Sequence, residues 1–81
     1  MKQQKFTVTA EGEGRLEVLN RISVLYIQRH IPVEQMHYLP LEGGTSRYEV
    51  CATTTEDTIR RVVGQMNNII ELNHVQYALC D

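Results

Sequence analysis

The chain has 81 residues, with ten acidic against eight basic side chains and a net charge of −2. This length suits a single small domain, and the balanced charge gives no general attraction for a phosphate backbone, so we expect no nucleic-acid binding. No apolar run is long enough to cross a bilayer, and neither Cys51 nor Cys80 belongs to a C-x-x-C pattern. These features predict a cytoplasmic protein that has no membrane contact and gains buried area by self-association.

The first predicted strand covers residues 4–10, where apolar and polar side chains alternate. A helix is predicted over residues 16–29 because its apolar residues recur with helical spacing, and Pro32 limits its end. A smaller apolar group lies away from the main stripe of this helix, so we expect another surface to cover it. Its members are Leu16, Val24 and Ile27.

A β-hairpin is predicted in the middle of the chain. Its first strand covers residues 33–41, and Pro40 favours a place at the edge of a sheet. Residues 42–45, which read EGGT, supply the glycines of the turn, and alternation resumes over residues 46–54.

A second helix is predicted after Thr54 and Thr55, whose hydroxyls are suited to cap a helix N-terminus. Its apolar stripe extends as far as Ile70, and Arg60 and Arg61 give the opposite face a basic character.

A final strand over residues 73–80 completes the order β-α-β-β-α-β. Right-handed crossovers place both helices on one face of a four-stranded antiparallel sheet, with the strands in the order four, one, three, two. We therefore predict an α+β fold, a ferredoxin-like sandwich that forms one domain over residues 1–81. This fold class by itself names no function.

The residues capable of metal or thiol chemistry are scattered. His30, His37 and His74 lie on different predicted elements, so we expect no metal site. Cys51 and Cys80 lie in strands with no basic neighbour in sequence, and we expect them to be inert.

Three glutamates, Glu11, Glu13 and Glu17, surround the junction between the first strand and the first helix. They could serve acid–base chemistry or hold a cation, but the favoured interpretation is a solvated turn. The same charges would repel a phosphate, and no nucleophile, base and orienting group come together by spacing. No catalytic residue is predicted.

Residues 19–40 read LNRISVLYIQRHIPVEQMHYLP. This segment resembles the ACT domain of acetohydroxyacid (acetolactate) synthase small, regulatory subunits. In that family a loop of the type E-N-x-x-G precedes a helix reading L-x-R-I/V…F-x-x-R-G/H/R and a strand reading N-I-E-S-L. The matching positions are Leu19, Arg21, Ile22, Tyr26, Gln28, Arg29, His30, Val33, Glu34 and Met36.

The resemblance implies a non-catalytic subunit that activates a large catalytic subunit of acetohydroxyacid synthase, a thiamine-diphosphate-dependent enzyme of branched-chain amino-acid biosynthesis. The small subunit itself carries no cofactor. Members of the family form homodimers through the first helix and the second strand, and bind valine at that seam. The implied seam residues are Leu16, Val24, Ile27, Val33, Glu34, Gln35 and Met36.

The chain departs from the family at its effector loop. The ligand-holding asparagine falls on Gly14, the loop glycine on Glu17, and the asparagine that opens the second strand on Pro32. These departures imply weak or absent binding of valine or another branched-chain amino acid, although a one-residue shift would restore Gly14 as the family glycine. The implied effector-loop positions are Gly14, Arg15, Leu16, Glu17, Asn20, Pro32 and Val33.

Three other classes share this topology. A free-standing ACT sensor of an amino acid or another small ligand is the main alternative. An RNA-recognition module would need aromatic side chains on the open face of the sheet, where this sequence places none. An acyl-phosphate hydrolase would need an arginine in the first loop, and Arg15 is surrounded by glutamates.

Overall fold

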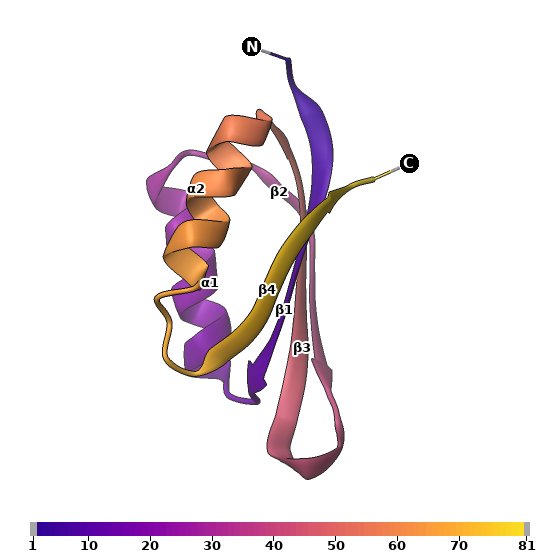
Figure 1. The fold of residues 1–81 in the computed structure, drawn as a ribbon, viewed down its shortest axis with the longest axis vertical. Helices are drawn as coiled ribbons and strands as arrows, with labels where there is room; N and C mark the ends of the chain where they lie inside the picture. The colour runs from indigo at the N-terminus through magenta and orange to yellow at the C-terminus, as the bar shows by residue number, and fades with distance from the viewer. Residues whose placement is uncertain (1, 81) are drawn as a thin grey trace.

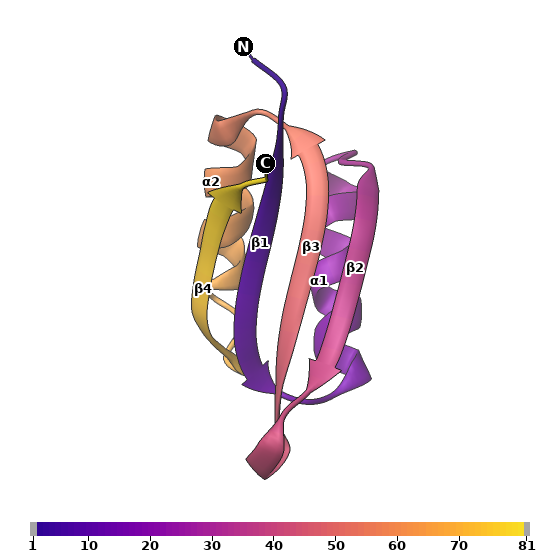
Figure 2. The ribbon, with the colours of Figure 1, turned by 90° about the vertical axis from the view of Figure 1, so that its right-hand side faces the viewer.

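The computed structural model describes residues 2–80 as one sheet with two helices on one of its faces (Figures 1 and 2). All strand pairs are antiparallel, and the strand order is β2-β3-β1-β4. The ferredoxin-like βαββαβ sandwich predicted from the sequence is confirmed. Its elements are β1 (Gln4–Glu13), α1 (Leu16–Gln28), β2 (Val33–Pro40), the short 3-10 turn η1 (Glu42–Gly44), β3 (Thr45–Thr54), α2 (Glu56–Met66) and β4 (Leu72–Leu79).

The core lies between the helices and the two central strands, β1 and β3. Along both strands every second side chain is buried, because only one face of the sheet is covered. The helices add three fully buried side chains each. The buried apolar side chains of these four elements are Phe6, Val8, Ala10, Tyr48, Val50, Ala52, Val18, Ile22, Tyr26, Ile59, Val62 and Met66.

The helix α2 is shorter than the sequence indicated. Thr55 is its N-cap and accepts a hydrogen bond from the Thr58 amide, whereas Thr54 is the last residue of β3. The helix ends at Met66, and the chain turns before Ile70, which is 95% exposed. The prediction that the apolar stripe extends to Ile70 is therefore wrong, because that residue lies beyond the helix.

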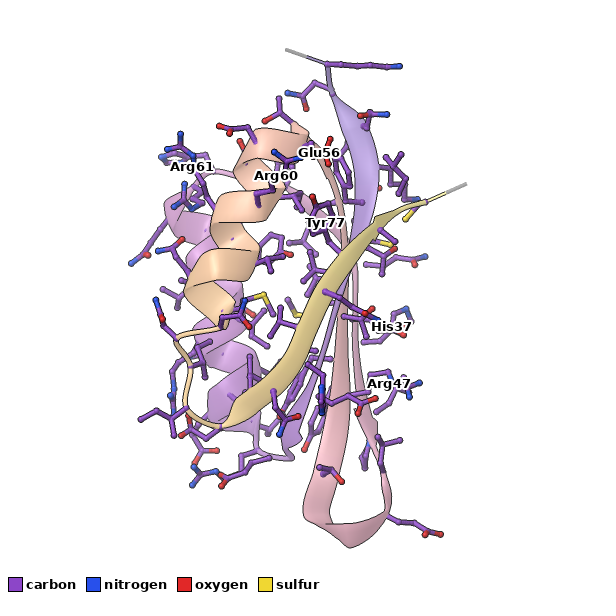
Figure 3. All side chains as sticks on the ribbon, in the orientation of Figure 1. His37, Arg47, Glu56, Arg60, Arg61 and Tyr77 are labelled. Carbon is purple, nitrogen blue, oxygen red and sulfur yellow. The ribbon has the colours of Figure 1, made fainter. Side chains whose placement is uncertain are left out.

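The outer face of α2 is not a free basic surface. Arg60 lies 3.4 Å from Glu56, and Arg61 lies 3.3 Å from Asp57, one helical turn earlier in each case. Arg60 also donates to the Tyr77 hydroxyl, which in turn donates to Glu56 (Figure 3). The basic character predicted for this face is thus balanced by carboxylates of the same helix.

The strand β1 is longer than predicted and continues from Ala10 to Glu13. Its last residues pair with the start of β3, and Glu11 forms an ion pair with Arg47 across the strands, at 3.1 Å. Glu11 therefore belongs to the sheet and not to a solvated turn. The extension moves the end of β1 close to the connection between α2 and β4.

Hydrophobic side chains remain exposed along α1 and the neighbouring edge strand β2. Leu16 and Ile27 are 67% and 68% exposed, and Val24 and Val33 are each 38% exposed. No helix among residues 2–80 is both long and apolar enough to cross a membrane.

Two glycines provide a matched test of packing. A β-carbon at Gly12 would lie 2.1 Å from the carbonyl oxygen of Glu71, whereas one at Gly64, inside α2, would meet no atom within 4 Å. We expect Gly12→Ala to lower the free energy of unfolding by about 2 kcal/mol. Gly64→Ala should raise it by about 0.5–1 kcal/mol, because alanine favours a helix interior. Urea denaturation of both variants measures the two effects, and a tolerated Gly12→Ala would contradict the close approach.

Candidate functional site

The connection between β1 and α1 is only two residues long, Gly14 and Arg15. It lies at one end of the molecule, beside the β2–β3 hairpin and the turn between α2 and β4 (Figure 1). In an ACT domain this connection is the effector loop implied by the sequence resemblance. Here three neighbouring segments hold it.

The β2–β3 hairpin contacts Gly14 directly. The Gly14 amide donates to the Gly44 carbonyl at 3.1 Å. A β-carbon at Gly14 would lie 2.3 Å from the hydroxyl oxygen of Ser46, which is itself 1% exposed. Packing against Ser46 therefore explains why the position has no side chain.

Tyr48 of β3 supplies a second anchor from beneath the connection. Its hydroxyl accepts a hydrogen bond from the Arg15 amide at 3.2 Å and donates to the Glu13 carbonyl. Its ring stacks on Tyr38, with 5.3 Å between the centroids. Burial raises the pKa of the Tyr48 hydroxyl above its ordinary value, so the group stays protonated and able to donate.

Glu71, in the turn before β4, supplies the third anchor. Its carboxylate accepts two hydrogen bonds from the Arg21 guanidinium, at 2.7 and 2.8 Å, and one from Arg15 at 3.2 Å. Its carbonyl accepts from the Glu13 amide at 3.0 Å. The hydrogen bonds from Arg21 lower the pKa of the Glu71 carboxyl, and the same contact raises the pKa of Arg21.

These contacts occupy the backbone donors of the connection. The amides of Glu13, Gly14 and Arg15 all bond to groups of the same chain. No cavity is found in the structure of residues 2–80. A ligand carboxylate would have to displace existing hydrogen bonds to reach these three donors.

The remaining effector-loop positions do not meet in one chain. Leu16, Glu17 and Asn20 are exposed at the start of α1. Pro32 and Val33 lie beyond its other end, and a 13-residue helix spans roughly 20 Å. A single chain therefore brings five of the seven implied positions together, and Pro32 and Val33 lie at the opposite end of α1.

The implied seam residues are exposed, except that Met36 is partly buried. Glu34 lies 3.4 Å from Lys5. Met36 packs partly against the core and accepts a hydrogen bond from the Ser23 hydroxyl, at 3.6 Å. Gln35 is exposed on the face of the sheet that carries no helix, opposite Cys51 in the strand register.

The sequence analysis missed the three anchors of the connection, Ser46, Tyr48 and Glu71. Tyr48 is buried, in keeping with the alternation predicted over residues 46–54, but that alternation gives its hydroxyl no partner. Only the strand pairing between β1 and β3 places that hydroxyl beneath Arg15. The alternation of apolar and polar residues in β3 predicts that Tyr48 is buried, but not which groups its hydroxyl contacts.

No protein-family model matches the chain, and no curated protein matches it. Solved structures do match over nearly its whole length. An uncharacterized protein from Thermotoga maritima superposes with a TM-score of 0.78 at 16% identity, covering 99% of this chain and 100% of that one. The ACT domain of a GTP pyrophosphokinase from Chlorobium tepidum superposes with a TM-score of 0.79 at 9% identity, covering 95% and 100%.

The chain has the fold of an ACT domain. The acetolactate synthase small subunit of Thermotoga maritima also superposes, with a TM-score of 0.75 at 16% identity. The match covers 96% of this chain and 48% of that subunit, so this chain spans about half of its length. Identities this low establish the shared fold alone.

Two buried tyrosines allow a comparison of how much a hydrogen-bonded and a non-bonded hydroxyl contribute to the free energy of unfolding. Tyr26 of α1 is 1% exposed, and its hydroxyl has no hydrogen-bond partner within residues 2–80. We expect Tyr48→Phe to lower the free energy of unfolding by about 1–3 kcal/mol, because it removes the two hydrogen bonds that join this hydroxyl to the Arg15 amide and the Glu13 carbonyl. Tyr26→Phe should leave it unchanged or raise it by up to about 1 kcal/mol. Equal losses in urea denaturation would contradict the assignment.

The Glu71 contacts predict a pH dependence. The pKa of Glu71 is lower in the folded chain than its ordinary value of 4.5. The ionised carboxylate therefore contributes fully to the free energy of unfolding above pH 4.5, and this contribution disappears as the pH falls through the lower, folded-state pKa. We expect Glu71→Gln to be less stable than wild type at pH 7 and equal to it in strong acid, by thermal unfolding. The control is Glu42→Gln on the exposed hairpin, where no ion pair is formed within residues 2–80. A pH-independent difference would assign the Glu71 effect to packing.

Proposed function

We propose that this chain is a non-catalytic regulatory subunit of an acetohydroxyacid synthase, acting as a homodimer that binds feedback amino acids weakly or not at all. The observation that carries the proposal is the closed connection between β1 and α1. This connection lies where an ACT domain would hold an effector. Here the amides of Glu13, Gly14 and Arg15 already donate to groups of the same chain.

Two kinds of likeness support the choice of enzyme. The sequence pattern over residues 19–36 resembles the small subunits of that synthase. The fold superposes on the acetolactate synthase small subunit of Thermotoga maritima over 96% of this chain. The proposed partner is therefore the large, thiamine-diphosphate-dependent catalytic subunit.

Side chains at the connection also oppose a carboxylate ligand. Glu17 places a negative charge in the first turn of α1, and Glu13 lies 3.2 Å from Arg15. Arg15 and Arg21, the nearby cations, are already engaged by Glu71. Valine or another branched-chain amino acid would meet fixed acidic groups and few available donors.

The proposed dimer follows from the surface of α1 and β2. The edge of β2 away from β3 has no strand partner in the described chain, and such an edge is available for pairing with another chain. The exposed Leu16, Val24 and Ile27 lie on the helix beside it. A second copy running antiparallel along this edge would also bring the Pro32 end of one chain to the Gly14 end of the other.

A free-standing ACT sensor is the second candidate. The observation that favours it is the uncharacterized Thermotoga maritima protein, whose solved chain is covered over 100% of its length. In this alternative a small ligand would bind the isolated dimer, whatever the catalytic partner.

Reconstitution tests the proposed partner. Mixing the purified chain with the catalytic subunit from the same cell should yield a stable complex and raise the rate of acetolactate formation. Ile27→Asp should convert the dimer to a monomer, as measured by the molecular mass of the particle in solution. Gln28→Asp, on the same exposed stretch, is the charge-matched control and should remain a dimer. A stable dimer that neither binds the catalytic subunit nor changes its activity would contradict the proposal.

Calorimetry separates the two candidates. We expect no saturable heat when the isolated dimer is titrated with valine, leucine or isoleucine. Saturable binding of any of the twenty amino acids would instead support the free-standing sensor.

A further inference from the structure

The two cysteines of the chain meet on the face of the sheet that carries no helix. Cys51 of β3 and Cys80, just after β4, lie on either side of Thr7 in β1. Their sulfur atoms are 3.7 Å apart. The Thr7 hydroxyl contacts both, at 3.1 Å from the Cys51 sulfur and 2.7 Å from the Cys80 sulfur.

The strand order opposes a disulfide between these residues. The strands that carry them flank β1, so this strand lies between the two backbones. A disulfide bond is about 2.05 Å long, so closing it from a sulfur–sulfur distance of 3.7 Å would need the two flanking strands to move toward each other around β1. Both thiols are free in the structure and half-buried.

The same separation suits an atom placed between the two sulfurs. Two metal–sulfur bonds of about 2.3 Å at a tetrahedral angle place the sulfur atoms about 3.8 Å apart, close to the distance seen here. We propose that Cys51 and Cys80 together bind one thiophilic metal ion, such as Zn²⁺, Cd²⁺ or Cu⁺. Soft thiolate ligands select these ions, and each thiol releases its proton on binding.

The surroundings indicate an open site and not a closed structural one. Within residues 2–80 no group of three or more histidine, cysteine, aspartate or glutamate side chains is suitably placed for a metal. The ion's other positions would therefore be filled by water or by the Thr7 hydroxyl, on a face without a covering helix. We therefore expect a solvent-accessible site whose ion exchanges readily. This proposal does not depend on the proposed function.

The sequence alone indicated the opposite, because 29 residues separate Cys51 from Cys80. The pairing of Thr7 with Cys51 and the hydrogen bond from the Cys80 amide to the Lys5 carbonyl bring them together. The predicted strand order already places the strands of both cysteines beside the first strand, but only the structure shows that their sulfur atoms are in contact.

Titration of the reduced chain with Cd²⁺, against a competing chelator and without oxygen, tests the site. The thiolate-to-cadmium charge-transfer band should saturate at one ion per chain. Cys51→Ser and Cys80→Ser should each weaken binding by about 100-fold or more, because each removes one arm of the chelate. Thr9→Val, on the same strand and the same face, should bind as the wild type does.

A second measurement needs no variant. Bound Cd²⁺ should slow the alkylation of both cysteines in the wild-type chain by the same factor, as measured by mass spectrometry. Protection of one cysteine alone, or a single-serine variant that binds as tightly as wild type, would overturn the proposal. Rapid formation of a disulfide within one folded chain under mild oxidation would overturn it as well, because the strands would then approach more closely than a bridging ion requires.

Discussion

The buried hydroxyl of Tyr48 is the group on which the arrangement of the connection between β1 and α1 depends. This hydroxyl donates to the carbonyl of Glu13, at the end of β1, and accepts from the amide of Arg15, just before α1. A side chain of β3 therefore fixes the position of the helix relative to the strand. With Tyr48 in place, the connection needs only Gly14 and Arg15. The shortness of this connection then fixes where α1 begins, and hence which of its side chains remain exposed beside β2.

The hydrogen bonds of the connection between β1 and α1 also limit what this end of the chain can bind. Hydrogen bonds to Glu71, Gly44 and Tyr48 occupy the amides of Glu13, Gly14 and Arg15. What the chain offers instead is surface: an unpaired strand edge, the apolar side chains of α1, and a sheet face without helices (Figure 2). In the proposed assembly these surfaces, and not a pocket, transmit the effect of the chain on its partner.

Patterns local in sequence predicted most of the fold. The alternation around Val8 and Val50 identified the central strands, and the EGGT turn identified the hairpin, because both depend on residues close in sequence. The failures depend on distant groups. β1 runs past Ala10 because it pairs with β3, and Ile70 is exposed because α2 ends four residues earlier. The contact of Cys51 with Cys80 likewise depends on the register between strands distant in sequence, which no local pattern records.

The most direct test of the account is hydrogen exchange at the amides of Gly14 and Arg15, measured by nuclear magnetic resonance on the purified chain with and without saturating valine. The account predicts protection comparable with that of the central β1 amides, because both donors are bonded to buried or paired acceptors, and no change on adding valine. Exchange at the rate of an unstructured peptide, or protection that rises saturably with valine, would contradict the claim that the chain itself closes its effector loop.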